Sequence, residues 1–197
     1  MKRIILLLLF LAEGCIAGAQ TPANPSRIYT IDMASSKVEF FVGSTVGDVN
    51  GKFGKWKGEF KVGTPGVPAS ATLNLEIAAT SISTGSSVKD KTIKGKKFFF
   101  VEQYPTIVFT STKVISTSDP NAFQVEGDFT LRGVTRKVVL QVTLDRDGKG
   151  GGQIFGNLAF DRRDFGMAEN VPLVRVGDSV RVRLDLAVSS TPMVPAI

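Results

Sequence analysis

The segment KFFFVEQYPTIVFTSTK, residues 97–113, joins a loop that carries three consecutive phenylalanines to a strand. Tyr104-Pro105 marks the end of the loop. Beyond the proline, Ile107 and Phe109 share one face and alternate with Thr106, Val108 and Thr110, which is the period of a β-strand. Three large rings gain nothing in a solvated loop, so we expect them to cover apolar surface, most simply the open end of a barrel.

Seven other segments show the same alternation, and none shows a sustained helical period. Long antiparallel strands with one apolar face form either a sandwich or a closed barrel, and closure also removes the exposed edges. The sequence therefore favours an all-β fold, an eight-stranded antiparallel β-barrel. The expected strands span about residues 36–42, 53–62, 70–78, 106–113, 122–131, 134–146, 153–161 and 178–189.

The alternation also indicates which side chains point into the barrel, since successive residues of a strand face opposite sides. A barrel of about eight strands is either filled by its side chains or holds one small ligand, and alternation does not distinguish these two states. The expected inward residues include Phe40, Trp56, Phe60, Leu75, Ile77, Ile107, Phe109, Phe129, Leu140, Leu158, Phe160 and Leu184.

The connection over residues 80–104 is the longest between expected strands, and loops of this length usually have structure or a function. Residues 87–97 favour one or two helical turns that break near Gly95. We expect this segment to cap one end of the barrel. The apolar side chains expected to face the barrel are Val88, Ile93, Phe98, Phe99 and Tyr104.

The first residues have the pattern of an export signal. Lys2 and Arg3 precede an apolar run at residues 4–12 that is too short to span a bilayer. Ala17-Gly18-Ala19 then fits a cleavage site. We expect a signal peptide at residues 1–19, cleaved after Ala19, and a periplasmic or secreted protein.

An alternative signal would be centred on Cys15, with that cysteine lipidated after cleavage. Both alternatives take the domain out of the cytoplasm. The mature chain is then expected to contain a disordered lead-in at residues 20–27, the barrel domain at residues 28–190 and a C-terminal tail at residues 191–197.

The reactive residue types are few. The chain has no histidine, and its one cysteine lies within the expected signal peptide, which argues against histidine-based triads, thiol catalysis and the usual zinc and haem ligand sets. The remaining acids, bases and tyrosines form no obvious catalytic constellation, and the basic residues follow no nucleic-acid-binding module. We therefore expect no catalytic residues, no metal, no required cofactor and no nucleic-acid partner.

The charge favours anionic partners. Removing Lys2, Arg3 and Glu13 with the signal peptide takes the 24 basic and 18 acidic residues to 22 and 17, a net charge of +5. Arg162 and Arg163 either meet a phosphate headgroup at the barrel mouth or pair with neighbouring carboxylates to close a turn. The lysines between residues 89 and 97 form either a solvated face or a patch that contacts an anionic membrane surface.

Short segments spread over the expected mature domain form a recognisable series in their order and spacing. They are Tyr29-Thr30-Ile31-Asp32, Lys37-Val38-Glu39-Phe40, Gly51-Lys52-Phe53, Ser83-Thr84-Gly85, Phe98-Phe99, Tyr104-Pro105-Thr106-Ile107, Gly127-Asp128-Phe129-Thr130-Leu131, Gly133-Val134-Thr135, Asp164-Phe165-Gly166-Met167 and Val176-Gly177-Asp178. Through these segments the chain resembles, over essentially the whole expected mature domain, the YceI-like family of exported, lipocalin-type proteins that bind polyisoprenoids.

The resemblance implies a lipocalin-like barrel whose inward residues and cap hold the tail of an isoprenoid lipid, such as a polyprenyl phosphate or an isoprenoid quinone, for storage or transport without catalysis. The chain departs from the family in having Thr92 and Arg132 where members often carry histidine, and in an altered region at residues 43–50. The alternative is an exported interaction barrel with a filled lumen that acts through its basic surface. Self-association remains open.

Overall fold

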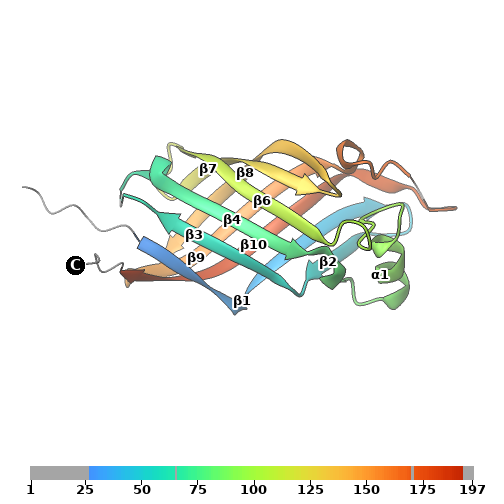
Figure 1. The fold of residues 1–197 in the computed structure, drawn as a ribbon, viewed down its shortest axis with the longest axis horizontal. Helices are drawn as coiled ribbons and strands as arrows, with labels where there is room; N and C mark the ends of the chain where they lie inside the picture. Colours follow the sequence, from blue (N-terminus) through green and yellow to red (C-terminus); the bar gives the residue numbers. More distant parts are fainter. Residues whose placement is uncertain (1–26, 65, 170, 193–197) are drawn as a thin grey trace, which may run out of the picture.

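Ten β-strands pair into one antiparallel sheet in the computed structural model, which describes residues 27–64, 66–169 and 171–192. The sheet closes on itself because β10 pairs with β1 as well as with β9 (Figure 1). Short 3-10 turns occupy Pro68–Ser70, Ala79–Ser81 and Arg162–Phe165. The strands are β1 (Arg27–Ser44), β2 (Val49–Phe53), β3 (Trp56–Val62), β4 (Ala71–Ala78), β5 (Ile82–Ser83), β6 (Thr106–Ser116), β7 (Ala122–Leu131), β8 (Val134–Arg146), β9 (Gly151–Asp161) and β10 (Val176–Pro192).

The ten strands form an eight-stranded barrel because two pairs of consecutive strands each take the place of one strand in the barrel wall. Only Gly54 and Lys55 separate β2 from β3, and β1 pairs with both of these strands. In the same way β4 continues into β5 through a 3-10 turn, and the two pair with β3 and β2. Ser81 stabilises both interruptions by accepting hydrogen bonds from the backbone of Gly54 and Lys55. The predicted closed, eight-stranded antiparallel barrel is therefore confirmed.

The first strand is longer than its alternation indicated, because it begins at Arg27 instead of near residue 36. Its pairing with β10 shifts register between Asp32 and Lys37. Ser36 fixes this irregularity by donating to the Asp32 carbonyl at 2.6 Å and accepting from the Ala187 backbone at 2.9 Å. The irregular segment hid the first half of the strand, since an inserted bulge interrupts the period of two.

The strands at the two ends of the chain also run slightly past the expected limits of the domain. They start at residue 27 and end at residue 192, against expected limits of 28 and 190. The expected signal peptide, most of the expected lead-in and residues 193–197 of the tail lie outside the described residues.

The predicted helical segment is present as α1 (Ser87–Lys94), which is capped by Gly95 and lies at one end of the barrel (Figure 1). Ser86 caps its first turn, and Asp90 accepts hydrogen bonds from the Thr84 backbone and hydroxyl at 2.7 Å each. Ile93, one turn after Asp90, is partly buried and packs against the apolar core. Val88 borders the apolar space at this end of the barrel together with Ile93, but it is 75% exposed and not buried.

The described part of the chain offers no helix whose length and apolar character would let it cross a membrane. α1 itself has only eight residues and carries three lysines.

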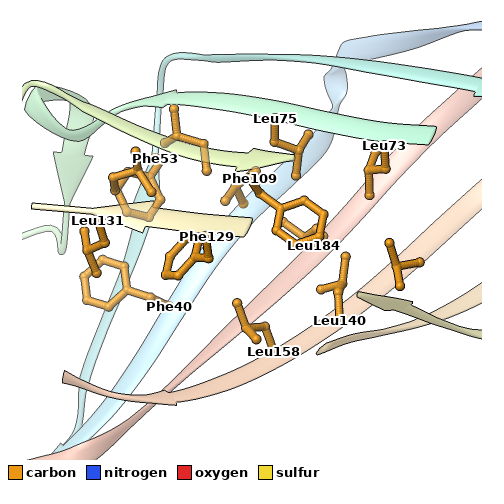
Figure 2. Packing of buried hydrophobic residues seen from close by; sticks show 14 of the residues in the cluster. Phe40, Phe53, Leu73, Leu75, Phe109, Phe129, Leu131, Leu140, Leu158 and Leu184 are labelled. Carbon is orange, nitrogen blue, oxygen red and sulfur yellow. The ribbon is translucent and has the colours of Figure 1, made fainter. Parts of the chain in front are cut away.

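Large apolar side chains fill the middle of the barrel. Figure 2 shows aromatic and leucine side chains from several strands meeting there. Two glycines make room for two of the rings: a Cβ added at Gly51 would lie 2.4 Å from the Phe40 ring, and one added at Gly127 would lie 2.6 Å from the Phe109 ring. We call the following set the central plug, all of it buried: Leu75, Phe109, Phe129, Leu140, Leu158 and Leu184.

Candidate functional site

The barrel contains an apolar cavity of about 290 Å³ at the end that carries α1, here called the helix-end cavity. Its wall comes from the barrel strands, α1, the phenylalanine loop and the β9–β10 connection. Very few polar groups reach it, so its chemistry suits a hydrocarbon. The apolar lining residues are Phe40, Val42, Val46, Val49, Val88, Ile93, Phe98, Phe99, Phe160, Met167, Val171, Val174, Val176 and Val180.

A second cavity, of about 400 Å³, lies at the other end of the barrel beside the β8–β9 hairpin and is here called the hairpin-end cavity. Tyr29 and Phe60 form part of its wall, with ring centroids 4.8 Å apart. Its lining at this end is polar and glycine-rich, because it includes Arg27 and the hairpin residues Asp145, Arg146, Gly148, Gly150, Gly151, Gly152 and Gln153. The two cavities therefore differ in the chemistry of their linings.

The β8–β9 hairpin has a defined shape. The Asp147 carboxylate accepts hydrogen bonds from the backbone of Gly151 at 2.9 Å and of Lys149 at 2.7 Å. These two bonds hold the pKa of Asp147 below its ordinary value, because they favour the charged carboxylate. Local hydrogen bonds between the Asp147 side chain and the backbone thus fix the turn beside the hairpin-end cavity.

The central plug separates the two cavities. Along β9, Ile154 lines the hairpin-end cavity, Leu158 lines neither cavity, and Phe160 lines the helix-end cavity. The same order holds along β10, where Leu184 lies between the cavity-lining Val188 and Val180. The interior is therefore hollow at both ends and filled in the middle.

The phenylalanine loop closes the helix-end cavity from the side of α1. Phe98 is 7% exposed, and the Phe99 ring packs 6.2 Å from the rings of both Phe40 and Phe53. Backbone hydrogen bonds of 3.0 and 3.1 Å tie Phe99 and Val101 to the last turn of α1. The loop and the helix therefore form one hydrogen-bonded cap over the cavity.

Arg162 lines the helix-end cavity and is 3% exposed. Its guanidinium donates to the carbonyls of Met167, Glu169, Val176 and Gly177 and lies 3.2 Å from the Asp178 carboxylate. A buried charge requires such partners, and this set anchors the β9–β10 connection to the barrel. A headgroup could reach this guanidinium only by displacing the carbonyls.

Arg163 is exposed and lies beside two carboxylates. Its Nε lies 3.0 Å from Asp161 Oδ1, and its Nη1 lies 3.2 Å from Asp178. The hydrogen bonds from Arg163 lower the pKa of Asp161 to about 2. Among the two alternatives for these arginines, the geometry matches pairing with carboxylates that closes a turn, and a headgroup contact stays a prediction.

Only some of the predicted ligand-binding residues line a cavity. Phe40, Ile93, Phe98, Phe99 and Phe160 line the helix-end cavity, and Phe60 lines the hairpin-end cavity. Leu75, Phe109, Phe129, Leu140, Leu158 and Leu184 form the central plug, while Trp56, Ile77, Tyr104 and Ile107 line neither cavity.

Several cavity residues were missed by sequence reasoning. Val49 and Tyr29 lie on strand segments outside the predicted boundaries, and a longer reading of those strands would have included them. Met167, Val171 and Val174 lie in an irregular connection, where no periodic signal marks an inward residue.

No group of three or more histidine, cysteine, aspartate or glutamate side chains suited to a metal ion occurs within the ranges that the structure covers.

The closed antiparallel barrel with an apolar interior places the chain in the lipocalin-type class of β-barrels. The chain belongs to the YceI-like family, since the model of the YceI-like domain matches residues 29–188. The resemblance seen in the sequence is thereby confirmed.

Curated relatives match over part of their length. A UPF0312 protein of Pseudomonas savastanoi pv. phaseolicola is 37% identical over 101 residues, which are 51% of this chain and 52% of that protein. A UPF0312 protein of Vibrio cholerae is 28% identical over 124 residues, 60% of this chain and 65% of that protein. The chain thus spans between about half and two thirds of the length of these relatives.

Solved structures share the fold. The crystal structure of Burkholderia cenocepacia BcnA has a TM-score of 0.73 at 23% identity and covers 80% of this chain and 99% of that one. A polyisoprenoid binding domain from Saccharophagus degradans, implicated in plant cell wall breakdown, has a TM-score of 0.61 at 16% identity and covers 83% and 98%. At these identities the likeness concerns the fold alone.

Proposed function

We propose that this protein binds the apolar tail of an isoprenoid lipid in its barrel and carries or stores it outside the cytoplasm without catalysing a reaction. The observation that carries this proposal is the helix-end cavity, whose walls are almost entirely hydrocarbon and which is covered by a hydrogen-bonded cap. A polyisoprenoid-binding domain with the same fold supports the choice of ligand class. A polyprenyl phosphate and an isoprenoid quinone both fit this description.

The size of the cavities limits how a tail can bind. Volumes of about 290 and 400 Å³ lie at the lower end of the roughly 300–1,000 Å³ that is usual for ligand pockets. A short tail therefore fits the helix-end cavity alone. A long tail has to continue toward the hairpin-end cavity, which requires the side chains of the central plug to change rotamer.

The energetics favour a carrier over a permanent store. Each methylene group that leaves water for the cavity contributes about 0.8 kcal/mol, so a tail is held firmly against loss into solvent. Relative to a bilayer the gain nearly cancels, because the tail is already in hydrocarbon there. The protein is then suited to exchange lipid with membranes. Export by the expected signal peptide, or anchoring through Cys15, belongs to this proposal.

The experiment that tests the proposal is native mass spectrometry of the purified chain, followed by organic extraction and by addition of farnesol and of a long-chain polyprenol. We expect either co-purified lipid or uptake of the added isoprenols at one ligand per chain. Lipid-free protein that takes up neither compound would contradict the proposal.

The central plug favours a second candidate, an exported barrel that acts through its basic outer surface. This second function predicts that the protein binds anionic polymers or vesicles and that the binding weakens steeply with added salt. It also expects no response to isoprenols, so the same preparation distinguishes the two functions.

A further inference from the structure

The three most exposed large apolar side chains among the described residues lie at the end of the barrel that holds the helix-end cavity. They are Val46, which is 70% exposed, Val88 at 75% and Leu173 at 101%, whereas the other exposed large apolar residues lie between 36% and 46%. They come from the β1–β2 turn, α1 and the β9–β10 connection, all at the same end of the barrel (Figure 1). Val46 and Val88 line the cavity itself. We call these three residues the apolar tip.

Leu173 occupies a backbone position that disfavours leucine. Val174 donates a hydrogen bond to the Val171 carbonyl at 3.0 Å, and Leu173 has a φ of 65° within this turn. Glycine or asparagine normally takes such a position, because a Cβ is strained there. The leucine side chain makes up for none of this strain by packing, since it is fully exposed. The backbone strain at Leu173 is not offset by any packing that stabilises the fold. We therefore take it as a sign that the exposed leucine side chain contacts a binding partner.

The apolar tip is held in place. Thr45 donates its backbone N–H to the Arg175 carbonyl at 3.0 Å, and Arg175 donates its own backbone N–H to the Thr45 hydroxyl at 3.1 Å. These bonds join the turn that carries Leu173 to the turn that carries Val46. Arg162 fixes the base of the same connection, so the tip is preorganised.

Exposed basic side chains lie on two of the elements that carry the tip, α1 and the β9–β10 connection. Lys89 and Lys91 of α1 and Arg175 beside the turn are exposed. Of the nearby acidic groups, Glu169 is ion-paired with Lys97 at 3.2 Å, and Asp90 is hydrogen-bonded to Thr84. Asp48 remains exposed in the β1–β2 turn and offsets one of the positive charges. Apolar side chains flanked by cations are the features that bind proteins to anionic bilayer surfaces.

We propose that the apolar tip docks on an anionic lipid bilayer, with its three side chains in the headgroup region and these basic side chains against the headgroups. This orientation places the mouth of the helix-end cavity on the membrane. A lipid tail could then pass between bilayer and barrel without crossing water. The biological meaning of docking rests on the proposed lipid-binding function, but the surface can be tested separately.

The test compares co-sedimentation of the purified chain with vesicles of phosphatidylcholine alone and of phosphatidylcholine mixed with phosphatidylglycerol. We expect binding to the mixed vesicles that weakens as salt is added. Leu173→Asn removes the apolar side chain and suits the backbone, so it should weaken binding by about tenfold or more while leaving the unfolding temperature unchanged or higher. Lys89→Gln should weaken binding about fivefold.

Val139→Thr is the matched control, because Val139 is 42% exposed on β8, outside the apolar tip, and this change should leave binding unaltered. Residues 1–26 are the same in every variant, so a difference in vesicle binding between variants is caused by the substituted residue. The proposal is overturned by a wild-type chain that ignores the mixed vesicles, or by a Leu173→Asn chain that binds them equally well. A dimer that Leu173→Asn dissociates, without vesicle binding, would assign the tip to a second copy and also overturn it.

Farnesol uptake without vesicles reports the lipid-binding function independently, and Leu173→Asn should leave it unchanged. A chain that takes up farnesol but ignores vesicles contradicts docking alone. A chain that binds vesicles through Leu173 but takes up no farnesol supports the docking surface and contradicts the lipid-binding function.

Discussion

The two ends of this barrel differ in how they are closed, although the strands between them follow one alternating pattern. At the helix end, aromatic side chains of a cap cover an apolar cavity, and the buried Arg162 anchors the neighbouring connection. At the hairpin end, a glycine-rich turn held by Asp147 lines part of a larger cavity. The strands thus supply a common apolar interior, and the connections decide what each end can bind.

The largest expected effect comes from removing the anchor of the helix end. Arg162→Met leaves four backbone carbonyls and the Asp178 carboxylate without their donor, so the free energy of unfolding should fall by about 3 kcal/mol or more. Urea denaturation measures this change. Arg163→Gln, at an exposed neighbour, should cost less than about 1 kcal/mol. Equal losses for the two variants would mean that Arg162 is not the anchor.

The middle of the barrel should tolerate added volume poorly. Gly127→Ala places a methyl group 2.6 Å from the Phe109 ring and 2.7 Å from the Thr110 carbonyl oxygen, which should lower the free energy of unfolding by roughly 1–3 kcal/mol. Gly43→Ala is the control, because its nearest neighbour would be 3.7 Å away. Thermal unfolding of both variants is the measurement. A Gly127→Ala chain as stable as the control would show that the side chains of the central plug shift at little cost in stability.

Substitutions at two comparable valines, one in each cavity, can show which cavity binds the ligand. Val49 lines the helix-end cavity and Val62 the hairpin-end cavity, and both are half-buried strand residues. Val49→Phe should weaken farnesol binding about tenfold, or about 1.4 kcal/mol, by filling the proposed site. Val62→Phe should have little effect on this short ligand. Isothermal titration tests both, and the reverse order of effects would move the site to the hairpin end.

The smallest effect concerns pH. Because hydrogen bonds from Arg163 lower the pKa of Asp161 to about 2, the folded state is favoured above the ordinary value of 3.8, and this contribution is lost as the pH falls through about 2. Arg163→Gln should return the pKa of Asp161 toward 3.8. Carboxyl chemical shifts measured by NMR over pH 1–6 would follow the titration. An Asp161 that titrates near 3.8 in the wild-type chain would contradict the pairing.

The sequence predicts the barrel because alternation records which side of a strand is dry. Leu75, Phe109 and Leu184 point inward as their spacing required, and each is buried. The prediction missed the first half of β1, because the irregularity after Asp32 breaks that period. The high exposure of Val88 was not predicted, because the spacing of two apolar residues in a short helix does not show how far other elements cover each of them.

The candidate site was less predictable than the fold. Alternation cannot show whether an inward side chain borders a cavity, and here Phe40 lines one whereas the equally buried Phe109 lines neither. The role of Arg162 depends on carbonyls that a connection brings together, five to fifteen residues further along the chain. Backbone geometry of this kind is a property of the folded chain.

The most direct measurement of lipid binding is a crystal structure of the chain saturated with geranylgeraniol. The hydrocarbon is expected in the helix-end cavity beneath Phe98 and Phe99, with its far end displacing side chains of the central plug. Density for the ligand only on the outer surface, or only at the hairpin end, would contradict a tail site under the cap.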